Sequence, residues 1–481
     1  MSEARSPGQL LSILGLGFGL AGAVGGTIGA GILRTPGLVA AQLPAPALVL
    51  AAWLLGGLHA LLGAVCTAEL AASLPRAGGW YVYAERAFGR RAGFLVGWTD
   101  WLAHCIGLAW VATTVGDYGA ALLPERLSLH PLAPQVIALA SLALFTAIQL
   151  GGVRAGSASQ ELLSLVKAAA FLALVAACFL VPLSAGDPAG AAAGPAAQLL
   201  PGPGSGTGAS AAAEAPLPLW RALLPAVLAL QGVITTYDGW ASPVYFAEEF
   251  TDPGRDLPRS LIGGVLAVLG LYLLINAALL HVLPLEQLAR SSLPAADAAR
   301  RLLGPLGGKV ITAVALLALL GLINTVVMAA PRILYGLSRD GLFPDFAQVV
   351  SPGGTPAAAL LLTTAAAALL VLAGSFDRLL GMGAVLYVCL PLAGIAALVA
   401  LRRREPELER PFRAWAHPLP ALLVAGVSLA FLVGDLLGDA GDGLLALGLV
   451  LAGTPLLQLS RPPSPARPAG ESGNLPDSPE T

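Results

Sequence analysis

Residues 25–37 read GGTIGAGILRTPG and lie in the first long apolar stretch of the chain. Five glycines, a proline and an arginine within thirteen positions make this segment a poor helix. In lipid, irregular backbone persists only where it lines a cavity or is buried in protein. The stretch therefore predicts a membrane helix that is interrupted near its middle and whose exposed backbone groups have a function.

The composition of the whole chain places that helix in a polytopic membrane protein. The 481 residues are 56% hydrophobic and only 11% charged, whereas soluble domains carry about a quarter charged residues. Apolar runs of about 20 residues each suffice to cross a bilayer, and the alternation typical of a barrel strand is absent. We expect an all-α fold with about 12 spans, at 10–33, 45–70, 92–122, 135–153, 162–183, 222–246, 260–283, 309–334, 356–374, 379–401, 418–437 and 443–460.

The positive charges predict the orientation of these spans. With the N-terminus inside, the cytoplasmic segments hold 17 of the Lys and Arg residues and the opposite side holds 8. Positive charge resists translocation, so this bias predicts a multi-pass protein of the cell (inner) membrane with both termini in the cytoplasm. The four cysteines lie within predicted spans and form no CxxC or His-rich pattern, so we expect no metal site.

Composition also predicts the division of the chain. Residues 184–218 and 461–481 are rich in Ala, Gly, Pro and Ser and are expected to form a disordered extracytoplasmic loop and a disordered cytoplasmic tail. Helices 1–5 (residues 1–183) and helices 6–10 (residues 219–401) would form two repeats. Residues 402–460 would hold helices 11 and 12 outside the repeats.

A second interruption supports this division. The sixth span contains TTYDGWASP at 235–243, a polar run with Asp, Gly and Pro. The first span of each five-helix set is therefore broken, and paired breaks at corresponding positions indicate an inverted-repeat transporter with its site near the midplane.

The first break suits a carboxylate. Unwinding near Gly29, Ala30 and Gly31 leaves N–H groups at the positive end of the outer half-helix, where they can bind an anion without a charged side chain. Glycine also lets a ligand approach the backbone closely. The alternative is that these glycines only allow close helix packing.

The second break suits an ammonium group, because unwinding exposes carbonyl oxygens at a half-helix end. The residues concerned are Thr235, Thr236, Tyr237, Asp238 and Gly239. A ligand that carries one carboxylate and one adjacent amine fits the two breaks together. The backbone alone therefore indicates an α-amino acid.

Four blocks of sequence resemble the amino acid–polyamine–organocation (APC) superfamily of amino acid permeases. They are GTIGAGILRTPG (26–37), AELAASLPRAGGWYVYAERAFGRRAGFLVGW (68–98), YDGWASPVYFAEEFTDPGRDLPRS (237–260) and NTVVMAAPRILYGLSRDGLFP (324–344). They follow the order found in that family. The resemblance implies the leucine-transporter type of fold, a 5+5 inverted repeat with broken helices 1 and 6 that works by alternating access.

The resemblance also implies roles for single residues. The family's carboxylate-binding motif falls on Gly29, Ala30 and Gly31. Its amine-binding carbonyls fall at about Thr27 and Ile28 and, in the sixth helix, at about Thr235, Thr236 and Asp238. The family often has an aromatic gate where this chain has Thr235, which suggests a roomier or more polar pocket. Tyr237 or Trp240 is a candidate to close it in part, with simple packing as the alternative for Trp240.

Lys167 is the ionisable residue that stands out inside a span. An ammonium in the bilayer interior costs at least about 2.5–3.5 kcal/mol, and snorkelling to the cytoplasmic surface is one way to avoid that cost. The other interpretation is that Lys167 faces the first break and replaces a sodium ion by binding unwound carbonyls. Because burial disfavours the charged ammonium, Lys167 is then a candidate to carry a coupling proton.

Other intramembrane polar groups give weaker indications. Asp100 and His104 lie one helical turn apart, so a mutual hydrogen bond is expected, with a proton path as the alternative. Asp238 is a candidate for a direct role at the substrate amine. Glu69 and Glu161 fall at span ends.

The function that fits best is a secondary amino acid transporter, proton-coupled or exchanging. The alternatives are an amine or polyamine antiporter of the same fold and a non-transporting amino acid sensor. Residues 123–134 hold no cysteine, so no disulfide-linked heavy chain is expected. No nucleotide-binding or hydrolase motif is present, which argues against an enzyme, and no cofactor or nucleic-acid partner is expected.

Overall fold

The computed structural model describes residues 10–124, 130–181, 219–373, 376–438 and 440–458, which form helices and no strands. The predicted loop at 184–218 and the predicted tail at 461–481 lie outside these residues. The fold is thus all-helical where it is described, as the hydropathy predicts.

Most of the helices overlap the predicted spans. In chain order they are α1 (Leu16–Thr27), α2 (Gly31–Gln42), α3 (Pro46–Ser73), α4 (Trp80–Phe88), α5 (Arg90–Leu122), α7 (Ala133–Leu150), α8 (Val153–Leu180), α9 (Leu219–Thr236), α10 (Pro253–Val282), α11 (Leu285–Arg290), α12 (Pro294–Leu303), α13 (Leu306–Arg339), α14 (Ala357–Ala373), α15 (Phe376–Arg404), α16 (Leu419–Gly438), α17 (Ala440–Ala452) and α18 (Thr454–Gln458). Two 3-10 helices, η2 (Ser242–Glu249) and η3 (Asp345–Gln348), complete the set. However, α2 ends nine residues beyond the first predicted span, and α8 begins nine residues before the fifth.

Several of these helices can cross a membrane by length and composition. Among the described residues, seven helices do so individually, and α1 with α2 forms a further span that is bent by 49°. Four shorter apolar segments lie in α9, α14, α16 and α17–α18. The predicted count of twelve spans includes these shorter segments and stays a prediction.

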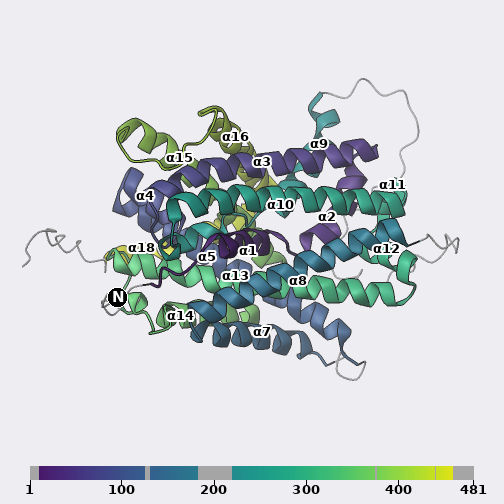
Figure 1. The fold of residues 1–481 in the computed structure, drawn as a ribbon, viewed down its shortest axis with the longest axis horizontal. Coiled ribbons are helices and arrows are strands. Elements are labelled where there is room, and N and C mark those ends of the chain that lie inside the picture. Colours follow the sequence, from purple (N-terminus) through teal and green to yellow (C-terminus); the bar gives the residue numbers. More distant parts are fainter. Residues whose placement is uncertain (1–9, 125–129, 182–218, 374–375, 439, 459–481) are drawn as a thin grey trace, which may run out of the picture.

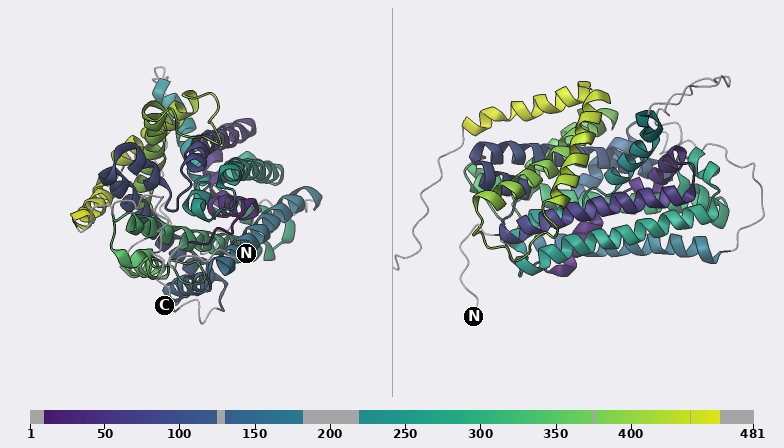
Figure 2. Two further views of the ribbon diagram at one scale, coloured as in Figure 1. Left: turned by 60° about the vertical axis from the view of Figure 1, so that its left-hand side comes forward. Right: turned by 90° about the horizontal axis from the view of Figure 1, so that it is seen from above.

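The long helices run roughly parallel to one another (Figure 1). Helices α4 and α18 lie at one end of the bundle, and α11 and α12 lie at the other end. Figure 2 shows α16 and α17 along one outer side, where both pack against α15. We call the end that holds α4 the inner end and the end that holds α11 the outer end.

A buried ion pair ties α13 to η2 near the inner end. Arg332 is 2% exposed and Glu249 is fully buried, and the guanidinium binds both carboxylate oxygens, with Nη2 to Oε2 at 2.9 Å. The Arg332 guanidinium also lies 4.5 Å from the centre of the Phe246 ring. Because α13 extends to Arg339, Arg332 lies within this helix and is buried in the bundle.

The chain before α1 closes on the same region. The amide of Leu14 donates to the carbonyl of Glu249 at 2.9 Å, and the amide of Thr251 donates to the carbonyl of Leu14 at 2.9 Å. Phe18 of α1 meets Phe246 edge to face, with ring centres 5.1 Å apart. These contacts bind the inner ends of the two broken spans to each other.

Replacing Arg332 by Met is expected to lower the free energy of unfolding by about 3–5 kcal/mol, because the Glu249 carboxylate is left buried without its partner. The double variant Arg332→Met, Glu249→Met should recover much of that loss. Arg76→Met, which removes a half-exposed partner of Asp340, should cost at most about 1 kcal/mol. Unfolding of the purified variants in mild detergent measures all three. Equal losses in the single and double Arg332 variants would contradict this account.

Candidate functional site

The first span breaks where its glycines predict. The α1 helix ends at Thr27, α2 begins at Gly31, and Ile28 has an extended backbone. The amides of Gly29, Ala30 and Gly31 donate no hydrogen bond to any residue that the structure describes. Gly31 is exposed and Gly29 and Ala30 are partly exposed. The start of α2 therefore offers three unpaired N–H donors at the positive end of a helix.

The sixth span breaks as well, in a different form from the first. The α9 helix ends at Thr236, residues 237–241 form turns, and the chain continues as the 3-10 helix η2. Gly239 has a φ of +102° in this turn, a region that favours glycine. The side chains of Thr235 and Asp238 are exposed, whereas Tyr237 is 1% exposed.

The two breaks touch through their glycines. A Cβ atom on Gly239 would lie 2.2 Å from the carbonyl oxygen of Gly26, and a Cβ on Gly26 would lie 2.6 Å from that of Gly239. The hydroxyl of Tyr272 on α10 bridges the carbonyl oxygens of Thr27 (3.1 Å) and Thr236 (3.3 Å). Two segments about two hundred residues apart in sequence thus form one site.

Lys167 lies at this site and does not reach the surface. It is fully buried, and its Nζ donates to the carbonyl oxygens of Gly25 and Ile28, each at 2.8 Å, and to that of Ala318 at 3.4 Å. Snorkelling is therefore wrong, and the placement of Lys167 against the first break is confirmed. The ammonium satisfies carbonyl oxygens that the end of α1 leaves without helical partners.

Polar side chains continue from Lys167 along one face of α8. Ser164 and Gln160 both donate to the carbonyl of Ala21 on α1, at 2.8 and 3.2 Å. Gln160 also accepts from Asn324 of α13 at 2.8 Å, and Asn324 in turn accepts from Gln149 of α7 at 2.9 Å. This network was not predicted, although the spacing of Gln160, Ser164 and Lys167 places their side chains on one face of a helix.

Asp100 and His104 form the hydrogen-bonded pair that their spacing predicts. Nδ1 of His104 lies 3.1 Å from Oδ1 of Asp100, and both side chains are buried. The Tyr245 hydroxyl of η2 donates to the same Oδ1 at 3.0 Å, which sequence reasoning did not find. The second carboxylate oxygen of Asp100 has no partner among the described residues.

Some predicted binding groups are already engaged within the chain. The carbonyls of Thr27 and Ile28 accept from Tyr272 and Lys167, so each has one lone pair left for another donor. The Thr235 carbonyl accepts from the amide of Asp238 at 3.3 Å.

Tyr237 and Trp240, the two aromatic candidates for closing the site, both pack against α3. Tyr237 donates to the carbonyl of Trp53 at 3.1 Å, and Trp240 is 9% exposed and lies over Gly63. The amides of residues 29–31 are thus left without a partner at the breaks. The side chains of Thr235 and Asp238 are exposed there, and the Thr235 hydroxyl donates to the carbonyl of Gln231 at 2.8 Å. Among the described residues, no three His, Cys, Asp or Glu side chains cluster as metal ligands.

Comparison with known proteins finds several that are similar to this chain over most of its length. The model of the family described as "Amino acid permease" matches residues 9–442. The serine/threonine exchanger SteT of Bacillus subtilis (strain 168) is 28% identical over 449 residues, which cover 92% of this chain and 95% of that protein. The Asc-type amino acid transporter 1 of Mus musculus is 29% identical, covering 85% of this chain and 72% of that protein. The b(0,+)-type amino acid transporter 1 of Mus musculus is 27% identical, covering 92% and 86%.

The contact between the breaks makes a prediction about stability. Gly239→Ala should lower the free energy of unfolding by roughly 2–5 kcal/mol, because it adds strain at positive φ and a clash with the Gly26 carbonyl. Gly29→Ala is the control, since its Cβ meets only Leu322 at 3.6 Å. Unfolding in mild detergent compares the two, and an equally stable Gly239→Ala would show that the breaks are not held in contact.

Proposed function

This chain belongs to the amino acid permease family, and from that premise we propose that it is a secondary transporter that moves amino acids across the membrane by alternating access. The observation that carries the proposal is the set of unpaired amides at Gly29, Ala30 and Gly31, which lies beside a second break. Three backbone donors at a helix N-terminus form a site for a carboxylate.

In the proposed complex, the substrate carboxylate binds the amides of residues 29–31. The substrate amine faces the sixth-span break and the remaining lone pairs of the engaged carbonyls. The residues that we assign to this site are Thr27, Ile28, Gly29, Ala30, Gly31, Thr235, Thr236, Tyr237, Asp238 and Gly239. Buried Tyr237 contributes backbone and support, whereas exposed Asp238 is placed to contact the substrate.

We further propose twelve spans with helices 1–5 and 6–10 as inverted repeats, both termini in the cytoplasm, and the inner end on the cytoplasmic side. The support is that α1–α2 and α9–η2 are interrupted at corresponding positions. The excess of positive charge in the segments assigned to the cytoplasm supports the orientation.

The packing of the half-helices supports alternating access. The inner halves α1 and η2 both pack against α13, and the Arg332–Glu249 pair reinforces that contact. The outer halves α2 and α9 pack on each other and on α3, and α2 also packs on α11 and α12. Gly31, Thr235 and Asp238 remain exposed. Because the inner half-helices are packed against α13 while residues at the breaks stay exposed, we assign this arrangement to a state that opens toward the outer end.

Lys167 is proposed to take the place of a coupling sodium ion and to carry a coupling proton. Its ammonium holds the carbonyls of Gly25 and Ile28 from one side while α13 supplies Ala318 from the other. Loss of a proton would remove these charge-assisted bonds and loosen α1 from α8 and α13. In this proposal, protonation of Lys167 is linked to the packing of the inner half-helix α1.

A polyamine carrier is the runner-up. A polyamine has no carboxylate, so the amides of residues 29–31 would stay unpaired in its complex. A non-transporting sensor would need no motion between the inner and outer halves. We also propose that the chain works without a disulfide-linked partner and has no catalytic activity.

Gly29→Leu is expected to reduce amino acid uptake into proteoliposomes by at least about tenfold, because the side chain covers the amides that bind the carboxylate through charge-assisted bonds. Gly270→Leu is the control, because Gly270 has open space on α10. Both variants should remain folded and monodisperse. Uptake by Gly29→Leu at the parent rate would refute the assigned site.

Uptake should proceed in sodium-free buffer, since the Lys167 ammonium occupies the position proposed for the ion. Lys167→Met should abolish that uptake, whereas Lys309→Met, which changes the only other lysine, should not. The measurement is uptake of a radiolabelled amino acid with N-methylglucamine replacing sodium. Strict sodium dependence of the parent protein would contradict the assignment.

A further inference from the structure

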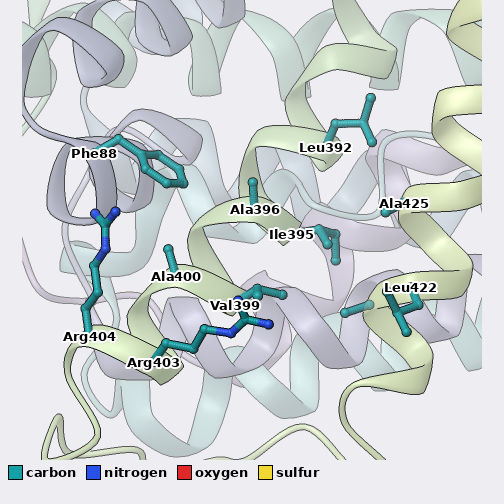
Figure 3. Close-up of a pocket in the computed structure, with 11 residues that line it drawn as sticks. Phe88, Leu392, Ile395, Ala396, Val399, Ala400, Arg403, Arg404, Leu422 and Ala425 are labelled. Carbon is teal, nitrogen blue, oxygen red and sulfur yellow. The ribbon is translucent and has the colours of Figure 1, made fainter.

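A groove with no part in the amino acid site lies between α15 and α16 at the inner end of the bundle. Its volume is about 530 Å³. Its walls are apolar and include Leu392, Ile395, Val399 and Leu422, with Phe88 of α4 on the far side (Figure 3). Small residues such as Ala396 and Ala425 line it as well and leave the space open.

Two arginines mark one end of this groove. Arg403 is exposed and forms no hydrogen bond or ion pair with any described residue, and Figure 3 shows its side chain extending along the groove from the end of α15. Arg404 donates to the carbonyl of Ala87 at 2.7 Å and lies near the Phe88 ring, but it has no carboxylate partner among the described residues. No acidic residue lines the groove. The positive charge of the two arginines therefore favours an anionic ligand.

The length of the groove matches one leaflet of a bilayer. Leu392 and Arg403 are eleven residues apart on α15, which spans roughly 16 Å at 1.5 Å per residue. Half of the hydrocarbon core is about 15 Å. The charged end thus sits at headgroup level when the apolar end reaches about the mid-plane of the bilayer.

We propose that this groove is a binding site for a single anionic phospholipid. The phosphate headgroup binds Arg403 and Arg404, because guanidinium groups bind phosphate oxygens in charge-assisted pairs. One acyl chain lies along Ile395, Ala396 and Val399 against Leu422. A free phosphate ion would use only the two arginines and would leave the apolar walls uncovered, and a second copy of this chain would have to bring an acidic group.

Native mass spectrometry of the full chain in detergent tests the proposal. We expect phosphatidylglycerol to occupy a first site at concentrations where phosphatidylcholine does not. Arg403→Gln should weaken that first binding step about tenfold, since it removes charge-assisted bonds to the headgroup. Arg154→Gln is the matched control, because Arg154 is an exposed arginine away from the groove, and it should bind as the parent does.

Filling the groove separates lipid from free anion. Ala396→Leu keeps both arginines and fills the space proposed for the acyl chain, so phosphatidylglycerol binding should fall. Both groove variants, Arg403→Gln and Ala396→Leu, should remain folded. The proposal is overturned if inorganic phosphate competes fully with the lipid, or if Arg403→Gln and Arg154→Gln bind equally. It is also overturned if either groove variant converts a dimer to a monomer, which would identify a second copy as the occupant.

Discussion

The structure depends on how the broken backbone of the first span is satisfied inside a membrane. A helix that stops at Thr27 leaves carbonyl oxygens that lipid cannot hydrate, and each unpaired group costs several kcal/mol. The Lys167 ammonium and the Tyr272 hydroxyl supply the missing donors from two different helices. The break therefore persists only because α8 and α10 are placed against it.

The backbone groups on the two sides of the break are satisfied unequally, and the proposed function rests on this difference. Carbonyls at the end of α1 are bound by side chains of the protein, whereas the amides at the start of α2 have no partner in the described residues. In the proposed complex, the substrate carboxylate binds these amides. Lys167 contacts the same short segment, so the proposed change in its protonation would act directly on the half-helix that carries the proposed site.

Much of this could be predicted from residue types and spacing. The glycines of residues 25–37 and the polar run at 235–243 place both breaks, and the four-residue spacing of Asp100 and His104 predicts their pairing. The contact of Gly26 with Gly239 could not be predicted, because it depends on the relative positions of distant segments. The same holds for the Tyr272 bridge and for Glu249, whose pairing with Arg332 needs η2 to lie against α13. The sequence of the sixth span also does not indicate that its second half, η2, forms a 3-10 helix.

The central claim is that the carboxylate and the amine of an amino acid both bind backbone groups at the two breaks. Isothermal titration of the purified chain, with the amino acid that stabilises it most against heat, tests this directly when compared with its methyl ester and its N-acetyl derivative. The account predicts that each modification weakens binding by at least about tenfold, because each removes charge-assisted hydrogen bonds. A methyl ester that binds as tightly as the free amino acid would contradict it.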